Sequence, residues 1–276
     1  RPRRPAGAVV KRALPGLLGL LLVAGPAAAY HDPETPATDY SIYTLKPWEL
    51  RLGLFAAELG LLESVQVSTY PLFWLVKVKN AQIKWRPWES GGRGVSLELG
   101  IFSLDLADFV DEQEAGKDYP QFKVVPFNLV GSSRHDDFTF NAGLSFTWVN
   151  FSGTVDSADL EAVGGASTVM FRPAIEYRLS RTFALVAEGR VKIYERYSGR
   201  VVTTYTIDAD SEVDVVGSAG AEVDGPKGNV GLSAYWSWAT FNLRLGLTYG
   251  HIAVPVVNVF IPQVSVFPIV DAFWRF

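Results

Sequence analysis

Short segments in which apolar and polar residues alternate recur along most of this chain. The clearest examples are residues 138–148, 169–177, 230–236 and 241–249. Because successive side chains of a strand point to opposite faces, each segment predicts a β-strand with one apolar and one polar face. No segment shows a helical period of useful length, and no window reaches about 18 consecutive apolar residues, the length of a helical membrane span. The chain is therefore predicted to be all-β.

The final segment, residues 264–276, reads VSVFPIVDAFWRF and alternates up to its last residue. Steps of two back from Phe276 through Trp274 give a continuous apolar row. At the edge of a soluble sheet this row would invite aggregation. In a closed barrel surrounded by lipid it would face hydrocarbon, with the terminal aromatic at the interface. We therefore predict a transmembrane antiparallel up-and-down β-barrel over residues 40–276.

A soluble β-sandwich or lipocalin-like barrel shares this alternation but turns its apolar face inward. Two observations favour lipid outside. The chain has 17 Phe, 11 Tyr and 8 Trp, concentrated on one face of the segments, and its charges gather on the opposite face. Charged residues make up 20% of the chain, below the roughly 25% of soluble domains. Counting the segments, with a first strand near residues 40–45, predicts about twelve strands, within a range of about ten to fourteen.

The expected connections alternate between tight turns and long loops, which is typical of outer-membrane barrels with their long loops outside the cell. Tight turns are expected at residues 131–137, 179–182 and 237–240. Long loops are expected at residues 103–119, 150–167, 196–229 and 250–263, with a further hairpin through 201–216 as the alternative within the third.

Two stretches resemble known bacterial proteins. The terminal Phe276 with its apolar row resembles the C-terminal signal of bacterial outer-membrane β-barrels, and this implies recognition by the barrel-assembly machinery through Phe276 and Trp274. Residues 44–86 resemble a group of uncharacterised proteobacterial outer-membrane barrel proteins, a likeness that implies the fold and no activity. It is carried by Thr44-Leu45 with Trp48-Glu49, Gly53, Gly60-Leu61, Val67-Ser68-Thr69 with Pro71, and Asn80 with Lys84 and Arg86.

The N-terminal residues 1–29 have the three-part layout of a secretory signal peptide. A basic region that ends at Arg12 precedes an apolar core, and an A-x-A site predicts cleavage near Ala29. A transmembrane anchor is the alternative, but Pro and Gly interrupt a core that is short for a span of about 20 residues. Residues 30–39 are polar and are predicted to form a short periplasmic tail. The predicted location is the outer membrane, with outer-membrane lipid as the surrounding partner.

Composition narrows the functional classes. Without cysteine the chain has neither disulfides nor thiolate metal sites. Removing the five basic residues of the signal peptide leaves 20 Lys and Arg against 29 Asp and Glu, a net charge of −9, which argues against nucleic-acid binding. No phosphate loop, nucleotide fingerprint or metal-ligand cluster is present, so no cofactor or metal is predicted. The sequence does not specify an oligomeric state.

The polar faces of the predicted strands carry a set of charged residues that we predict to line the interior. They are Arg51, Lys84, Arg86, Arg172, Glu176, Arg178, Glu188, Arg190, Lys192 and Arg244. Cationic side chains in a pore favour anions, so one interpretation is a narrow anion-preferring pore for small solutes. The alternative is a plugged barrel with a structural or surface-interaction role, whose interior charges, including Glu176 and Glu188, pair across strands.

The acidic stretches at 105–118 and 208–224 hold potential Ca²⁺ ligands but no EF-hand spacing, so they predict solvated loops.

Catalysis is the third functional class. The histidines are His31, His135 and His251, and a lipid hydrolase would need one of them beside a serine at the lipid-facing rim. His135 shares a turn with serines and aspartates, and turn formation explains these residues better. We predict no enzymatic activity.

Overall fold

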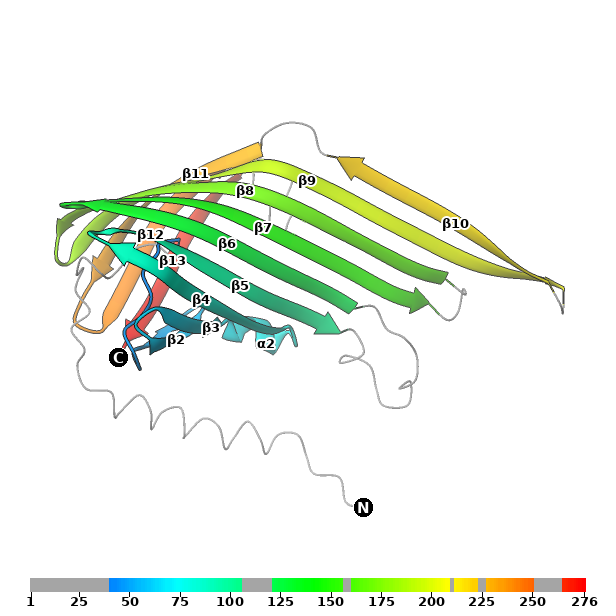
Figure 1. Ribbon diagram of the computed structural model, residues 1–276, viewed down its shortest axis with the longest axis horizontal. Helices are drawn as coiled ribbons and strands as arrows, with labels where there is room; N and C mark the ends of the chain where they lie inside the picture. The colour runs from blue at the N-terminus through cyan, green and yellow to red at the C-terminus, as the bar shows by residue number, and fades with distance from the viewer. Residues whose placement is uncertain (1–39, 106–120, 156–159, 209–210, 223–226, 251–264) are drawn as a thin grey trace, which may run out of the picture.

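The computed structural model describes residues 40–105, 121–155, 160–208, 211–222, 227–250 and 265–276. Their strands form a single antiparallel sheet that curves round into a barrel (Figure 1). In chain order the strands are β1 (Leu50–Gly53), β2 (Ala57–Leu62), β3 (Val65–Thr69), β4 (Lys79–Ser90), β5 (Arg93–Asp105), β6 (Gln121–His135), β7 (Phe138–Val155), β8 (Leu160–Ser180), β9 (Phe183–Asp208), β10 (Ser211–Glu222), β11 (Lys227–Ser237), β12 (Phe241–Gly250) and β13 (Ser265–Arg275). One short helix, α2 (Pro71–Leu75), follows β3.

The barrel closes because β8 pairs with β9 while β13 pairs with β1. Strands β10 and β11 both pair with the same edge of β9, through Glu222 with Arg196 and Lys227 with Lys192. They therefore share one place in a ring of twelve, which confirms the predicted fold and strand number. The expected strand near residues 40–45 is wrong, since this segment forms no ladder and the first strand begins at Leu50.

Side-chain exposure shows that the barrel has an apolar exterior and a polar interior. Leu232 and Leu247 are 62% and 59% exposed on the outer faces of β11 and β12, whereas Ser233 and Asn242 on the inner faces of the same two strands are buried. A soluble barrel has the opposite arrangement. The outer face thus matches lipid, as predicted.

Strand β13 shows the predicted outward row. Val266, Val270 and Trp274 are exposed, while Phe273 is buried inside. The backbone of Phe276 exchanges two hydrogen bonds with Leu50, at 2.9 and 3.1 Å. The last residues of the chain therefore join the first strand and complete the ring.

The barrel wall has two unequal parts. Strands β4 to β9 and β11 to β13, the long wall, have at least 10 residues each, and β9 has 26. Strands β1, β2 and β3, the short wall, have 4, 6 and 5 residues, fewer than the about 9–11 of a membrane-spanning strand. After the last residue of β3 the chain forms α2, which lies beside β4 (Figure 1). Phe73 of α2 contacts the ring of Phe102 on β5 at a centroid distance of 5.8 Å.

Three of the expected connections agree with the structure and two do not. Tight turns join β6 to β7, β8 to β9 and β11 to β12, as predicted, and we call this end of the barrel the tight-turn end. The expected long loops at 150–167 and 196–229 are largely strand, because β7, β8 and β9 continue and β10 pairs with β9 from Arg196 to Asp208. Backbone pairing can continue through segments of small polar residues that lack apolar alternation. The alternative hairpin through 201–216 is confirmed.

Several predictions concern residues outside the described ranges. They include the signal peptide 1–29, the tail 30–39, most of the acidic stretch 105–118 and the long loop at 251–263. None of the described residues belongs to a helix that is long and apolar enough to cross a membrane.

Candidate functional site in the barrel interior

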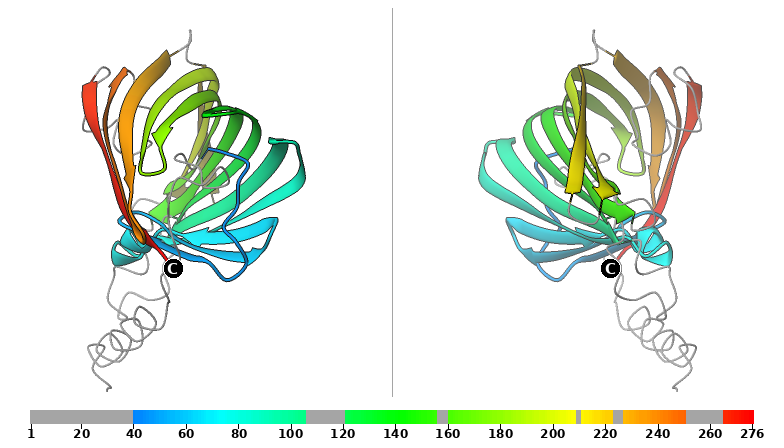
Figure 2. Two further views of the ribbon diagram at one scale, coloured as in Figure 1. Left: turned by 90° about the vertical axis from the view of Figure 1, so that its left-hand side faces the viewer. Right: turned by 90° about the vertical axis from the view of Figure 1, so that its right-hand side faces the viewer.

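Residues 40–47, the inner segment, run inside the ring of strands near the tight-turn end (Figure 2). Ser41, Ile42 and Tyr43 are at most 2% exposed. The backbone N–H of Ile42 donates to Ser132 Oγ of β6 at 3.1 Å, and that of Leu45 donates to Gln66 Oε1 of β3 at 3.0 Å. The inner segment therefore connects β3 to β6 inside the barrel and occupies part of its interior.

Two glycines of the wall make room for the inner segment. A Cβ on Gly94 of β5 would lie 2.6 Å from Ile42 Cδ1, and a Cβ on Gly60 of β2 would lie 2.0 Å from the Lys46 carbonyl oxygen. Only glycine permits such close approach. Burial raises the pKa of the Tyr43 hydroxyl above its usual value, because the charged phenolate would be desolvated inside the barrel.

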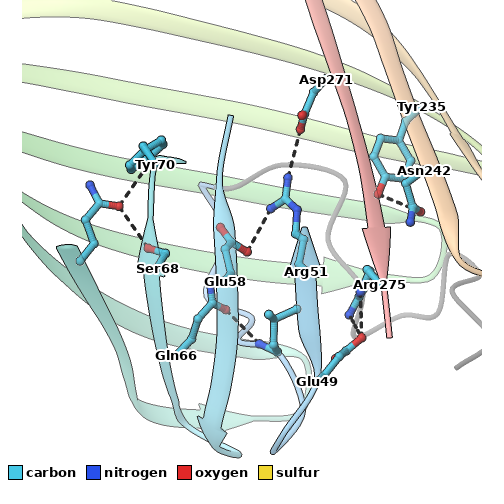
Figure 3. Close-up of polar contacts among 12 residues, drawn as sticks. Glu49, Arg51, Glu58, Gln66, Ser68, Tyr70, Tyr235, Asn242, Asp271 and Arg275 are labelled. Carbon is cyan, nitrogen blue, oxygen red and sulfur yellow. Dashed lines mark hydrogen bonds and ion pairs between the residues drawn. The ribbon is translucent and has the colours of Figure 1, made fainter. Parts of the chain in front are cut away.

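Ion pairs gather where β13 meets the short wall (Figure 3). Arg51 of β1 donates to Glu58 of β2 at 3.2 Å and to Asp271 of β13 at 3.0 Å. Arg275 of β13 contacts Glu49 at 2.7 Å. All five side chains are at most 20% exposed. Each pair joins segments that are adjacent in the ring but mostly distant in the sequence.

Further pairs lie on β4, β9 and β12. Arg244 Nη2 lies 3.0 Å from Glu188 Oε2, although β11 separates the two strands. Lys192 pairs with Glu195 on β9. Arg86 pairs with Glu89 on β4 and donates to the Glu63 carbonyl. Most of the interior charge is therefore compensated locally.

Between β6 and β7 the interior hydrogen bonds join uncharged side chains, whereas β8 adds the buried charges Arg172, Glu176 and Arg178. Ser145 Oγ donates to Asn128 Oδ1 at 2.6 Å, and Ser132 donates to Asn141. Asn141 in turn donates to Glu176, which is fully buried. This arrangement satisfies buried polar groups, as the interior of a filled barrel requires.

Two arginines lie beside the first described residue. The guanidinium carbon of Arg172 (β8) lies 3.2 Å from the centroid of the Tyr40 ring, and that of Arg190 (β9) lies 5.9 Å from it. Arg172 donates to Ser145 Oγ at 3.3 Å. Among the described residues, no carboxylate forms an ion pair with Arg172 or Arg190.

A cavity of about 410 Å³ lies between the inner segment, the short wall and β13. Arg51, Lys84, Arg190 and Arg244 line it together with Glu58, Glu98, Glu188 and Asp271. Phe267, Ile269 and Phe273 add apolar surface. The cavity thus offers both charged groups and an apolar surface to a small solute.

The structure gathers part of the predicted interior set at this cavity. Arg51, Lys84, Glu188, Arg190 and Arg244 line it. Arg172, Glu176, Arg178 and Lys192 are buried, and Arg86 lies near the β2–β3 turn. Their role in lining a pore stays a prediction.

Five charged partners among the described residues escaped the sequence interpretation: Glu58, Glu89, Glu195, Asp271 and Arg275. Asp271 and Arg275 alternate with the apolar row of the last segment, so this alternation could have placed both side chains on the inner face. Glu195 could not be placed, because a bulge in the pairing of β8 with β9 leaves both Ile193 and Tyr194 exposed and reverses the faces beyond them.

Among the described residues, those considered for catalysis do not form a triad. Ser133 Oγ and His135 Nε2 lie 3.2 Å apart on the exposed β6–β7 turn, whereas Ser132 is buried and bonds to Asn141. His31 and His251 lie outside the described ranges. Within the described residues there is no cluster of three or more His, Cys, Asp or Glu residues that could hold a metal ion.

No protein-family model and no curated protein sequence matches the chain. Among solved structures it is similar to the TodX monoaromatic hydrocarbon channel deltaS2 mutant, with 11% identity, a TM-score of 0.44, and coverage of 85% of this chain and 68% of that one. The CymD monoaromatic hydrocarbon channel follows with 9% identity, a TM-score of 0.39, and coverage of 83% and 66%.

The ferric yersiniabactin uptake receptor FyuA from Yersinia pestis shares 11% identity at a TM-score of 0.36, with 90% of this chain covering 44% of the receptor. Similarities this low do not support a functional conclusion. The resemblance of residues 44–86 to a group of uncharacterised outer-membrane proteins stays a prediction.

Proposed function

We propose that this protein is an outer-membrane channel for small solutes. The observation that carries this proposal is the 410 Å³ cavity, lined by charged side chains, inside a barrel whose outer face is apolar. A barrel of this kind can offer a polar route through lipid. Export by a signal peptide, cleavage near Ala29 and insertion by the barrel-assembly machinery belong to the same proposal.

An anion preference is the finer part of the proposal. Arg51, Arg244 and Lys192 lie beside carboxylates that compensate their charge. Arg172 and Arg190 form no ion pair among the described residues, so they leave uncompensated positive charge in the interior. Uncompensated cations along a pore attract anions and repel cations. The predicted interior residues, Arg190 above all, would then set the selectivity.

The inner segment sets the conductance in this proposal. Its buried residues occupy the interior near the tight-turn end, so solutes would pass only when the segment shifts. The contact from Ser96 Oγ to the Ser41 carbonyl oxygen, at 3.4 Å, offers a place to restrain it. Because the chain has no cysteine, Ser41→Cys with Ser96→Cys would introduce the only thiol pair.

The experiment is single-channel recording of the refolded chain in a planar bilayer under a salt gradient. We expect discrete conductance steps with anion preference in the wild type. The double-cysteine variant should conduct less under oxidation and recover on reduction, while the single Ser96→Cys variant should not respond. A correctly inserted barrel that stays silent in both redox states would refute the channel.

A plugged barrel with a structural or surface role is the second candidate. It is favoured by the buried inner segment and by the ion pairs that join β1, β2 and β13. The same recording separates the two candidates, because a plugged barrel inserts without conducting.

We also propose that the protein has no enzymatic role. Ser133 and His135 lie on an exposed turn, and among the described residues no carboxylate forms an ion pair with His135 that would orient it. A phospholipid-hydrolysis assay tests this point. Fatty-acid release that His135→Ala abolishes would overturn it.

A further inference from the structure

We propose that Arg172 and Arg190 form a binding site for the carboxylate group of a small anionic solute, covered by the ring of Tyr40. This inference rests on the proposed channel function and names the class of solute. The two arginines project from the paired strands β8 and β9. Both approach the same aromatic ring, Arg172 at 3.2 Å and Arg190 at 5.9 Å from its centroid.

The positive charge of the two arginines favours a bound anion. Arg172 is only 8% exposed, and its Nε has no hydrogen-bond partner among the described residues. Glu188, the carboxylate nearest to Arg190 along β9, forms an ion pair with Arg244 at 3.0 Å. Buried charges are normally paired, and a ring face compensates a guanidinium only weakly. An anion placed between the two arginines would supply the missing charge.

The geometry of a guanidinium suits a carboxylate as this anion. Its planar fork of N–H donors matches the two oxygens of a carboxylate and also fits a phosphate. Arg172 Nη1 is directed to Ser145 Oγ at 3.3 Å, which leaves its unpartnered Nε to receive a ligand. Arg190 lines the cavity and can donate from a second side.

The cavity limits which carboxylates fit. Its volume of about 410 Å³ is in the lower part of the range for small-molecule sites, about 300–1,000 Å³. Phe267, Ile269 and Phe273 of β13 give the cavity apolar surface. Arg190 lines the cavity and Arg172 does not, so a carboxylate with a short apolar chain or a single ring would contact Arg190 and this surface from the cavity side.

Tyr40 connects solute binding to the inner segment. Its ring stands against Arg172 and Arg190, where the anion would bind, and it begins the inner segment. An incoming carboxylate competes with the ring, because a charge-assisted bidentate contact is stronger than a cation–π contact. Solute binding would then loosen the segment that occupies the interior.

The experiment is isothermal titration calorimetry on the full chain refolded in detergent micelles, with butyrate, neutral butyramide and inorganic phosphate as probes. We expect butyrate to bind and butyramide not to bind. Arg190→Gln should weaken butyrate binding by about tenfold or more, because one bidentate contact is lost. Arg181→Gln, an exposed arginine at the β8–β9 turn, is the matched control and should leave binding unchanged.

Tyr40→Ala provides an independent test, since removal of the competing ring should raise the affinity for butyrate. Folding of each variant is checked by the electrophoretic shift between heated and unheated samples. Equal binding of butyrate and butyramide, or an Arg190→Gln variant that binds like the wild type, would overturn the site. Phosphate that binds more tightly than butyrate would overturn the assignment to carboxylates.

The titration does not require conductance, so the two proposals fail separately. A silent bilayer with intact butyrate binding would refute the channel and keep the site. Conductance without butyrate binding would do the reverse.

Discussion

The short wall and the long wall hold their interior side chains in different ways. Where the short wall meets β13, the interior is held by charge, with Arg51 between Glu58 and Asp271. Across β6 and β7 of the long wall it is held by uncharged groups such as Ser145 and Asn128. The two parts have the same alternation, so strand pattern alone does not explain the difference.

Strand length does explain it. Strands β6 and β7 pair along their whole length, from Gln121 with Ser152 to His135 with Phe138, so the backbone ladder fixes their register. Strand β1 pairs with β13 through only Arg51, Leu52 and Gly53. Because a short ladder specifies register weakly, side-chain pairs must help to hold it. Arg51 does so by bonding to the strands on both sides of β1.

The largest expected effect comes from breaking this joint. Arg51→Ala would leave Glu58 and Asp271, which are 11% and 20% exposed, without this cation, and breaking a fully buried pair typically costs about 3–5 kcal/mol. We expect urea-induced unfolding in micelles to shift accordingly. The control is the triple variant Arg51→Met, Glu58→Gln and Asp271→Asn, which removes all the charges and should recover much of the loss. An Arg51→Ala variant as stable as the wild type would mean that the backbone ladder alone closes the ring.

The outer face gives the second largest effect. Leu245 lies in the middle of β12 and is exposed to the surroundings. Leu245→Arg should cost about 2–4 kcal/mol at mid-membrane, against about 0–1 kcal/mol near an interface. Leu62, at the β2–β3 turn of the short wall, is the matched position, and Leu62→Arg should be tolerated. Equal costs in unfolding experiments would contradict the placement of the membrane.

A smaller effect is expected inside the long wall. Ser145→Ala removes the donor to Asn128 and the acceptor for Arg172, and leaving such buried groups unsatisfied costs about 1–3 kcal/mol. Ser145→Thr keeps the hydroxyl and is the control. If Ser145→Ala cost as much as Arg51→Ala, the contrast between the two walls would disappear.

The smallest effect on stability is expected at Phe276, whose contribution to closure is made by its backbone bonds to Leu50. Phe276→Ala keeps those bonds, so the refolded protein should change by only about 0.5 kcal/mol. In cells we expect less protein in the outer membrane, with secretion intact, because the proposed assembly signal is the side chain. Normal outer-membrane levels in a fractionation experiment would refute that signal.

The alternation in the sequence was sufficient to predict the faces of several strands of the long wall. The outward positions of Val266, Val270 and Trp274 follow from it, as do the inward positions of Arg172 and Arg244. Alternation is a local property, since each side chain is placed by its immediate neighbours along the strand. Prediction failed at Glu195, where a bulge in the pairing with β8 reverses the faces.

The sequence by itself thus determined the all-β class, the lipid-facing exterior and the approximate number of strands, because these depend on a repeat of two residues. Only the tertiary structure decided how far β1 to β3 extend, that residues 40–47 run inside the barrel, and which charges meet. Arg51 and Asp271 are separated by 220 positions and touch only because the ring closes. Such contacts depend on register and closure, which arise from pairing between distant strands and leave no local pattern in the chain.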